Sequence, residues 1–312
     1  MYDLIVRTRR LNKLKVALVI LVVVLIILII FTSIRLVQMY NVSKTKYAYD
    51  LWINEVNAQI SAREEAEKAR FASLNEEELE RFNSIYKHQD NKRVFLTFDD
   101  GPSTSVTPYI LDLLKEQNIK ATFFVLGLKV EANPDLVKRE YDEGHFIANH
   151  GYSHKYGDIY SSSQAVLDEY NKTNDAIKNA LGNENYNSLV FRFPGGSSGG
   201  PYHDIKQEAK ELLKQNGIAS VDWNALTNDA AGANTKEKIM ENFYNTVQDK
   251  TSVVILMHDA SDKILTYECL PEMIQYFKDN GYEFKTMYDV IGRGWILFEM
   301  WYELQCRRKI DD

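Results

Sequence analysis

Two adjacent carboxylates mark the stretch of this sequence best suited to chemistry. The apolar residues 94–96 indicate a buried strand, and Thr-Phe-Asp-Asp-Gly-Pro follows at residues 97–102. Neighbouring side chains of a strand point to opposite faces, so Asp99 and Asp100 share one pocket only if the backbone bends there. The Gly-Pro pair is a strong turn signal and predicts that bend. Taken alone, the stretch is more typical of a solvated acidic turn.

Four further polar clusters, each at the end of a later predicted strand, favour a functional site instead. In the first, His150 and His154 stand four residues apart. On one helical turn, this spacing lets two imidazoles chelate one ion. With one carboxylate they form a His-His-Asp set that leaves positions open for water and substrate. Such nitrogen and oxygen ligands suit Zn²⁺, with Co²⁺ or Ni²⁺ as alternatives. The second aspartate then remains free to act as a base towards metal-bound water.

Arg192 begins the second cluster, Arg-Phe-Pro-Gly-Gly, at residues 192–196. A guanidinium among carboxylates at strand ends is expected to orient one of them through a bidentate pair. The two glycines allow a substrate to approach the backbone closely. A plain surface turn is the alternative interpretation of this cluster.

The last two clusters are Asp222-Trp223 and His258-Asp259. An aspartate next to a histidine fixes its tautomer and raises its pKa, which predicts a general acid that is active near neutral pH. Trp223 offers a flat apolar face that suits a sugar ring, although a buried core position explains it equally well.

Strand-like and helix-like segments alternate from residue 93 onward. The predicted strands are 94–98, 121–126, 146–148, 189–193, 218–221, 252–257 and 283–286. The predicted helices are 107–117, 134–143, 163–181, 204–214, 235–248 and 271–278. Strict alternation implies parallel strands with right-handed crossovers.

An open doubly wound sheet and a closed barrel both fit this alternation. The polar clusters follow five different strands, and a barrel brings the ends of those strands to one mouth, whereas an open sheet spreads them along an edge. We therefore predict an α/β fold, a distorted (β/α) barrel with about seven parallel strands.

The N-terminal segment predicts a membrane anchor. Residues 16–31 are an unbroken apolar run that extends to residue 34, close to the roughly 20 residues that a membrane-spanning helix needs. Basic residues outnumber acidic ones in residues 1–15, so the positive-inside rule places that segment in the cytoplasm and the catalytic domain outside the cell. A cleaved signal peptide is the alternative, but the sequence after the apolar run offers only a poor cleavage site.

Residues 35–91 are charged and rich in helix formers, which predicts a helical stalk. A weak stalk dimer is an alternative, although apolar heptads are not sustained. Residues 92–290 form the predicted catalytic domain. The tail, residues 291–312, is expected to pack against the barrel wall.

Composition limits the other partners. The net charge of −7 and the pI near 5.5 argue against a general affinity for nucleic acid, because phosphate binding needs a basic face. Cys269 and Cys306 are too few for a disulfide scaffold and form no metal-type Cys-x-x-Cys pair, and whether they pair with each other is left open.

Five motifs of the sequence resemble, in order, those of the polysaccharide deacetylases, which are carbohydrate esterase family 4 or NodB-homology domains. They are Thr-Phe-Asp-Asp-Gly-Pro at 97–102, His-x-x-x-His at 150–154, Arg-x-Pro-x-Gly at 192–196, Asp-Trp at 222–223 and Leu-Met-His at 256–258. The resemblance covers residues 93–290. It implies a metal-dependent amidohydrolase that removes acetyl groups from N-acetylated sugars in polymers.

The resemblance also implies a role for each matching residue on the metal side of the site. Asp99 resembles the catalytic base. Asp100, His150 and His154 resemble the metal ligands, and Arg192 resembles the residue that holds the base.

On the opposite side, His258 resembles the general acid and Asp222 the aspartate that tunes it. Trp223 and Leu256 resemble the walls of the pocket for the acetyl methyl group. The backbone N–H of Gly195 is the expected donor to the oxyanion.

Two positions depart from the family pattern. Gly151 stands where the family usually has serine or threonine, so a hydroxyl that supports the loop is missing. Gly195 stands where an aromatic residue is common, so a wall of the substrate groove is missing. Neither change removes a catalytic group, but both weaken an inference of substrate from the family.

An enzyme tethered outside the cell meets the cell wall first, so N-acetylglucosamine in peptidoglycan is the substrate we expect. Poly-N-acetylglucosamine, chitin oligomers and acetylxylan are alternatives. A non-catalytic wall-binding module, or a membrane adaptor that acts through its stalk, are further alternatives. The wall-binding module is disfavoured because every expected catalytic group is present in the sequence. Deletion of residues 1–91 would distinguish the adaptor, because an enzyme predicts a soluble domain that still hydrolyses.

Overall fold

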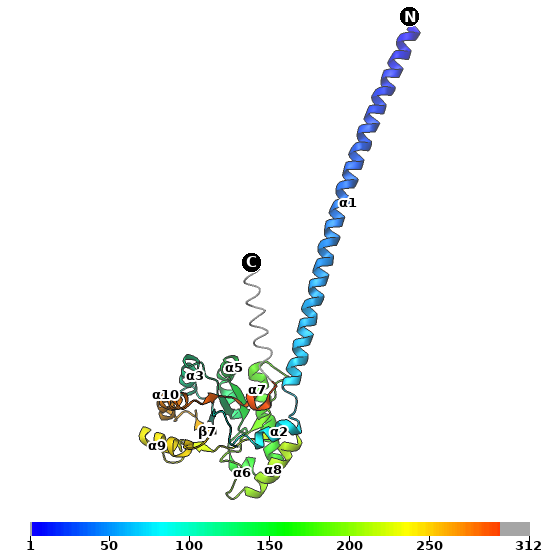
Figure 1. Ribbon diagram of the computed structural model, residues 1–312. Coiled ribbons are helices and arrows are strands. Elements are labelled where there is room, and N and C mark those ends of the chain that lie inside the picture. Colours follow the sequence, from blue (N-terminus) through cyan, green and yellow to red (C-terminus); the bar gives the residue numbers. More distant parts are fainter. Residues whose placement is uncertain (1, 294–312) are drawn as a thin grey trace. The chain divides into compact units, whose positions relative to one another are not determined.

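The computed structural model describes the backbone of residues 2–293 and the side chains from residue 15 to residue 293. The chain divides into two compact units, with the boundary after Glu65 (Figure 1). The second unit therefore begins well before residue 92, where the catalytic domain was expected to start. Phe82 and Ile85 explain the difference, because both are buried in a hydrophobic cluster with residues of the sheet.

The first unit consists of most of helix α1 (Tyr2–Arg70). The sequence of this helix contains neither glycine nor proline, which allows 69 residues to continue without a break. The apolar side chains of residues 18–31 are exposed. Among the described residues, α1 is the single helix that is both long enough and apolar enough to cross a membrane.

The second unit opens with the end of α1 and the short helix α2 (Glu76–Asn83). A capping box begins α2: the Asn75 side chain accepts from the backbone N–H of Glu78, and the Glu78 side chain accepts from the backbone N–H of Asn75. Glu78 also forms a two-point ion pair with Arg293, both contacts being 2.6 Å. Arg293 further donates to the backbone carbonyls of Ala69 and Arg70, so residues from the two ends of the unit lie together.

One parallel sheet forms the centre of the second unit. Its strands are β1 (Arg93–Asp99), β2 (Thr122–Val125), β3 (Phe146–Asn149), β4 (Val190–Phe191), β5 (Ala219–Ser220), β6 (Ala225–Leu226), β7 (Ser252–His258) and β8 (Glu283–Phe284). They lie in the order β5-β4-β3-β2-β1-β7-β6, and β8 pairs with the first residues of β1. The seven predicted strands are all present, whereas the two-residue strand β6 was not predicted.

A short connection shows that this sheet is curled. Strands β5 and β6 lie at opposite ends of the strand order, yet only residues 221–224 join them. A fully extended connection of that length spans at most about 17 Å, so the two edges of the sheet must approach each other. The fold is therefore a distorted (β/α) barrel, as predicted, and the carboxyl ends of its strands converge.

Helices follow most of the strands. They are α3 (Thr107–Glu116), α4 (Gly127–Ala132), α5 (Pro134–Asp142), α6 (Tyr156–Ile159), α7 (Ser163–Leu181), α8 (His203–Gln215), α9 (Lys236–Val247), α10 (Ile264–Asp279) and α11 (Met287–Ile291). As predicted, α7 ends at Gly182, whose φ of +61° suits glycine.

Helix α10 differs from its prediction. It begins at Ile264 and contains Pro271, which was expected to begin it. The proline removes one helical hydrogen bond. Buried side chains on both sides of it, including Leu270 and Met273, hold the helix against the core.

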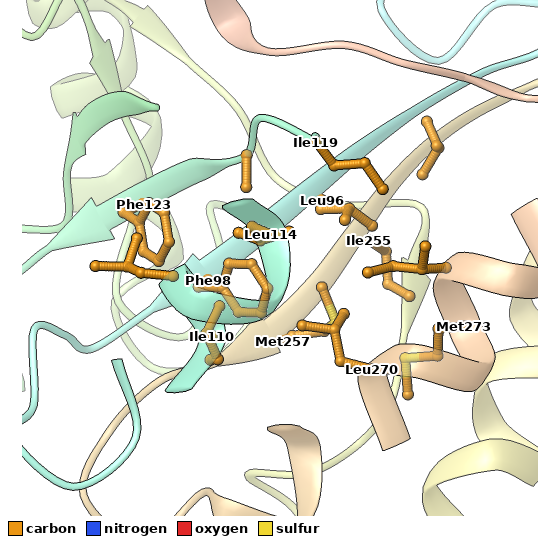
Figure 2. Packing of buried hydrophobic residues seen from close by; sticks show 14 of the residues in the cluster. Leu96, Phe98, Ile110, Leu114, Ile119, Phe123, Ile255, Met257, Leu270 and Met273 are labelled. Carbon is orange, nitrogen blue, oxygen red and sulfur yellow. The ribbon is translucent and has the colours of Figure 1, made fainter. Parts of the chain in front are cut away.

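Alternation along β1 separates the packed face of the sheet from the face that carries the site. Leu96 and Phe98 lie in the hydrophobic cluster with Ile255 and Met257 of β7 and with side chains of α3 and α10 (Figure 2). Thr97 and Asp99 point to the other face, because successive side chains of a strand alternate. Phe95, on the same side of β1 as Thr97 and Asp99, is buried in a second hydrophobic cluster with side chains of α2 and α11. That side therefore becomes polar only towards the carboxyl end of the strand.

Two parts of the sequence prediction fall outside the described residues. The tail beyond Arg293 is one of them. Cys306 is the other, so its pairing with the buried Cys269 stays untested.

Candidate active site

The end of β1 brings both aspartates into one pocket. Asp100 has a φ of +71°, a left-handed conformation that aspartate adopts more readily than most residues. The predicted bend therefore falls on Asp100 itself, just before the Gly-Pro pair. His150 Nε2 lies 3.7 Å from Asp99 Oδ2 and 3.5 Å from Asp100 Oδ1, so both carboxylates face the same imidazole.

Asp100, His150 and His154 converge as the sequence predicted. His154 Nε2 lies 3.4 Å from Asp100 Oδ1, and the ligand atoms of all three residues lie within 4.8 Å of one another. The expectation that a helical turn pairs the histidines is wrong, because residues 150–155 form a loop. Positive φ values at Gly151 (+82°) and His154 (+56°) fold that loop so that the two imidazoles approach.

These three residues fit a divalent cation. The Nδ1 atom of His150 lies 2.8 Å from the Arg192 carbonyl, which fixes the ring so that Nε2 faces Asp100. Burial lowers the pKa of His150 to about 3, so the imidazole is neutral, the form that binds metal. Asp100 Oδ1 is buried and has no hydrogen-bond partner among the described residues. A cation is the partner that such an atom between two imidazole nitrogens would take.

Glu169 of α7 supports the loop that carries the histidines. Its carboxylate accepts hydrogen bonds from the backbone of Tyr152 (2.8 Å) and Ser153 (3.0 Å) and from the Ser153 hydroxyl (2.6 Å). Glu169 therefore supports this loop even though glycine at position 151 supplies no side-chain hydroxyl. Sequence reasoning missed Glu169, since nothing near it in the chain signals a site.

Arg192 is completely buried and holds Asp99 through a hydrogen bond. Its Nη1 atom donates to Asp99 Oδ1 at 2.7 Å and to the Thr97 hydroxyl at 2.8 Å. The expected bidentate pair is wrong, because the other guanidinium nitrogens donate to the carbonyls of Val221 and Asp222. Burial raises the pKa of Asp99, although the charge of Arg192 opposes that change. A raised pKa brings a carboxylate closer to the strength of a base that works near neutral pH.

His258, at the end of β7, is partnered by Asp229 and not by the predicted Asp222. Asp229 Oδ1 lies 2.8 Å from His258 Nδ1, and Asp229 Oδ2 accepts from the His258 backbone and from the Thr266 hydroxyl. Burial alone would lower the pKa of His258, but the hydrogen bond and charge of Asp229 raise it to about 9. His258 is therefore protonated at neutral pH, as a general acid must be.

Asp222 has a different partner. Its carboxylate accepts from the backbone N–H of Ser197 at 2.9 Å and from the Ser197 hydroxyl at 2.6 Å. Its backbone carbonyl accepts from Arg192. Asp222 thus fixes the loop that contains Gly195 and Gly196, and its position does not fit the role of tuning His258.

Trp223 and Leu256 are half-buried, as side chains that line a pocket would be. Leu256 is only partly covered while its neighbours Ile255 and Met257 are buried. A Cβ atom on Gly196 would lie 3.1 Å from the Trp223 ring, so the glycine backbone packs directly against the indole. The backbone of Gly195 is exposed.

Comparison with known proteins places this fold and site in one class. The structure is similar to a CE4 esterase of Streptococcus mutans, with a TM-score of 0.60 and 32% identity, covering 69% of this chain and 92% of that one. It is also similar to the catalytic domain of a peptidoglycan N-acetylglucosamine deacetylase of Eubacterium rectale, with a TM-score of 0.57 and 31% identity, covering 69% and 91%. The class is therefore carbohydrate esterase family 4.

Sequence comparison leads to the same family. The profile of the family "Polysaccharide deacetylase" matches residues 86–221. A peptidoglycan-N-acetylglucosamine deacetylase of Bacillus cereus is 32% identical over 211 residues, which are 66% of this chain and 73% of that protein. The chain belongs to the polysaccharide deacetylase family.

A longer relative shares only part of its length with this chain. The peptidoglycan-N-acetylglucosamine deacetylase PgdA of Listeria monocytogenes is 38% identical over 212 residues. Those residues are 67% of this chain but 41% of the Listeria protein.

Proposed function

We propose that this protein hydrolyses the N-acetyl group of N-acetylglucosamine residues in peptidoglycan, releasing acetate and leaving a free amine on the sugar. Family membership supports the reaction type, and the names of the Listeria and Bacillus cereus relatives support this polymer. The observation that carries the proposal is that a possible base and a possible acid, Asp99 and His258, stand beside one possible metal site. A buried carboxylate held by Arg192 and an imidazole with a pKa of about 9 both lie at the carboxyl edge of the sheet, beside a three-residue metal site.

Asp100, His150 and His154 would hold one divalent metal ion, with Zn²⁺ as the expected metal and Co²⁺ or Ni²⁺ as alternatives. When bound there, the ion would polarise the acetyl carbonyl and lower the pKa of water. The neutral state of His150 and its fixed orientation towards Asp100 prepare the site for that ion.

Asp99 is the proposed base that takes a proton from the attacking water. Its Oδ1 atom is occupied by Arg192, which leaves Oδ2 on the side of His150 and of the metal site. Arg192 keeps the carboxylate in one orientation and, through its charge, limits the rise in pKa that burial causes. The base is therefore already oriented towards the metal site and needs no rearrangement before it acts.

His258 is the proposed acid that gives a proton to the departing sugar nitrogen. Asp229 keeps the imidazole protonated and fixes its orientation through Nδ1, which leaves Nε2 as the donor. The backbone N–H of Gly195, an exposed residue, is the proposed donor to the oxyanion, and Trp223 and Leu256 are the proposed walls for the acetyl methyl group.

Acetate release from a panel of polymers tests this function. The full chain in detergent would be incubated with peptidoglycan, poly-N-acetylglucosamine, chitin oligomers and acetylxylan. We expect the highest kcat/KM on peptidoglycan. A clear preference for another polymer would change the substrate, and no acetate from any of them would refute the function.

Metal removal is a separate test of the same site. A chelator is expected to abolish activity, and added Zn²⁺ to restore it, because the reaction needs the cation that these three ligands would hold. Metal analysis should find about one ion per chain. Full activity in the presence of excess chelator would remove the metal from the mechanism.

We also propose that residues 16–34 anchor the protein in the cell membrane as a single span, with residues 1–15 in the cytoplasm and the catalytic domain outside. The exposed apolar surface of α1 supports a membrane-embedded helix. The alternative, a cleaved signal sequence, predicts a shorter mature chain. N-terminal sequencing of the protein from membranes distinguishes them, since an intact N-terminus fits the anchor alone.

A further inference from the structure

The space beside Gly195 is filled by a side chain from another part of the chain. A Cβ atom on Gly195 would lie 2.6 Å from the Tyr156 hydroxyl oxygen and 3.2 Å from its Cζ atom. No side chain fits at position 195 unless Tyr156 moves. The φ of +73° at Gly195 adds a second reason why glycine is retained.

Tyr156 is held in this place from two directions. Its ring centroid lies 5.5 Å from that of His154 and 5.7 Å from that of Tyr160. The Tyr160 hydroxyl donates to the Pro194 carbonyl at 2.7 Å, which fixes helix α6 against the loop that contains Gly195. Tyr156 is therefore placed between the metal-site loop and that glycine loop.

The ring is also available to a ligand. Tyr156 is 41% exposed although it contacts both loops. Beside the second glycine, the Trp223 ring would lie 3.1 Å from a Cβ atom on Gly196. Two aromatic side chains from separate elements thus flank the two glycines, and the exposed one stands next to the metal ligand His154.

We propose that the ring of Tyr156 is a specificity-determining wall of the substrate groove. It supplies from α6 the aromatic surface that a side chain at position 195 would otherwise provide. The apolar C–H face of the N-acetylglucosamine ring whose acetamide reacts would pack on it, because tyrosine combines an apolar face with little conformational freedom to lose. This inference rests on the proposed deacetylase function and adds to it the residue that receives the sugar.

Substitution of Tyr156 tests the ring. Tyr156→Leu and Tyr156→Ala remove it, and Tyr156→Phe keeps it. The control is Tyr244→Ala on α9, a comparably exposed tyrosine that pairs with Glu272. For each variant of the full chain in detergent, KM and kcat would be measured for acetate release from tetra-N-acetylchitotetraose. Calorimetry would give the affinity for the same oligosaccharide with the metal chelated, and circular dichroism would check folding.

We expect Tyr156→Leu and Tyr156→Ala to raise KM and weaken affinity about fivefold to tenfold, the size of one aromatic contact, with a smaller change in kcat. Tyr156→Phe and Tyr244→Ala should stay within twofold of the parent. Unchanged KM and affinity in a folded Tyr156→Leu variant would overturn the inference. An equal loss in Tyr156→Phe would overturn it too, because the hydroxyl and not the ring would then bind.

Failure of the inference can be separated from failure of the function. If the parent chain releases acetate normally while Tyr156→Leu changes nothing, only the role of Tyr156 is refuted. If the parent releases no acetate from this oligosaccharide or from any polymer of the panel described above, the deacetylase function is refuted. The calorimetric affinities then still decide whether the ring binds the oligosaccharide.

Discussion

Two buried carboxylates in different regions of the second unit show what burial does and does not achieve. Asp99 at the end of β1 is 2% exposed, and Glu140 on α5 is completely buried. Burial raises the pKa of both. Asp99, however, faces Arg192 and His258, whereas neither carboxylate oxygen of Glu140 has a hydrogen-bond partner among the described residues.

The difference is one of partners. Around Asp99, the positive charges of Arg192 and His258 oppose the rise in pKa that burial causes. Around Glu140, the effect of Asp259 adds to that of burial, and both raise the pKa of the carboxyl. A perturbed pKa alone therefore does not identify a catalytic carboxylate. The arrangement of the opposing charges does.

The largest expected effect comes from removing the charge of Asp99. Asp99→Asn should lower kcat by about 10²–10⁴-fold, because the amide cannot take the proton of water. Its metal content should match the parent, since Asp100 and the two histidines are intact. Steady-state kinetics and metal analysis measure both. Near-normal kcat would refute the base assignment, and Glu140→Gln is the matched control that should retain activity.

A smaller effect is expected from substitution of Asp229, which raises the pKa of His258 and thereby sets the upper pH limit of activity. His258 must be protonated to act, so activity should persist up to its pKa of about 9 and fall above it. In Asp229→Asn, the largest influence that opposes burial is lost and only Asp99 and Asp100 still raise that pKa, so the pKa falls and the alkaline limb should move to lower pH. At pH 8 we expect at least about a tenfold loss of kcat.

Asp222→Asn is the matched control for Asp229, because Asp222 bonds to Ser197 and not to His258. The pH–rate profile of each variant distinguishes the two aspartates. An alkaline limb that moves in Asp222→Asn, and stays in place in Asp229→Asn, would show that the sequence-based assignment was right.

The smallest effect, on stability alone, is expected at Glu140. When the folded pKa of a carboxyl is raised, the unfolded chain releases its proton first, and stability falls as pH rises above the unfolded pKa near 4.5. Glu140→Met removes this loss. It should raise the free energy of unfolding by about 1–3 kcal/mol at pH 8 and by less at pH 5.

Urea denaturation of the full chain at the two pH values measures this difference. Glu241→Met, at an exposed position on α9, is the control that should show little change. A stabilisation in Glu140→Met that is the same at both pH values would mean that ionisation of Glu140 plays no part.

Most of the fold and the metal side of the site could be predicted, because the signals are local. Alternating strands and helices define the barrel, and Asp99, Asp100 and His150 each stand at the end of a strand. Parallel strands that curl bring such residues together whatever the details of the loops. That Arg192 orients a carboxylate followed from the same reasoning, and the family resemblance identified that carboxylate as Asp99, whereas the predicted bidentate geometry was wrong.

The remaining site residues reach the pocket through tertiary structure. Asp229 lies in the loop after β6, and a strand of two residues leaves no periodic signal in the sequence. Glu169 points from the middle of a helix to a loop 16 residues earlier, and Tyr156 fills space beside a glycine of another loop. Such contacts become visible only in the three-dimensional structure.

The contacts of Arg293 have a consequence for when the compact unit can fold during synthesis. It bonds to carbonyls at the end of α1 and to Glu78, while β8 pairs with the start of β1. The earliest-synthesised segments of the compact unit thus find partners among its last described residues, 283–293. Translation must reach residue 293 before that unit can close, so its folding is completed only once nearly all of it has been released from the ribosome.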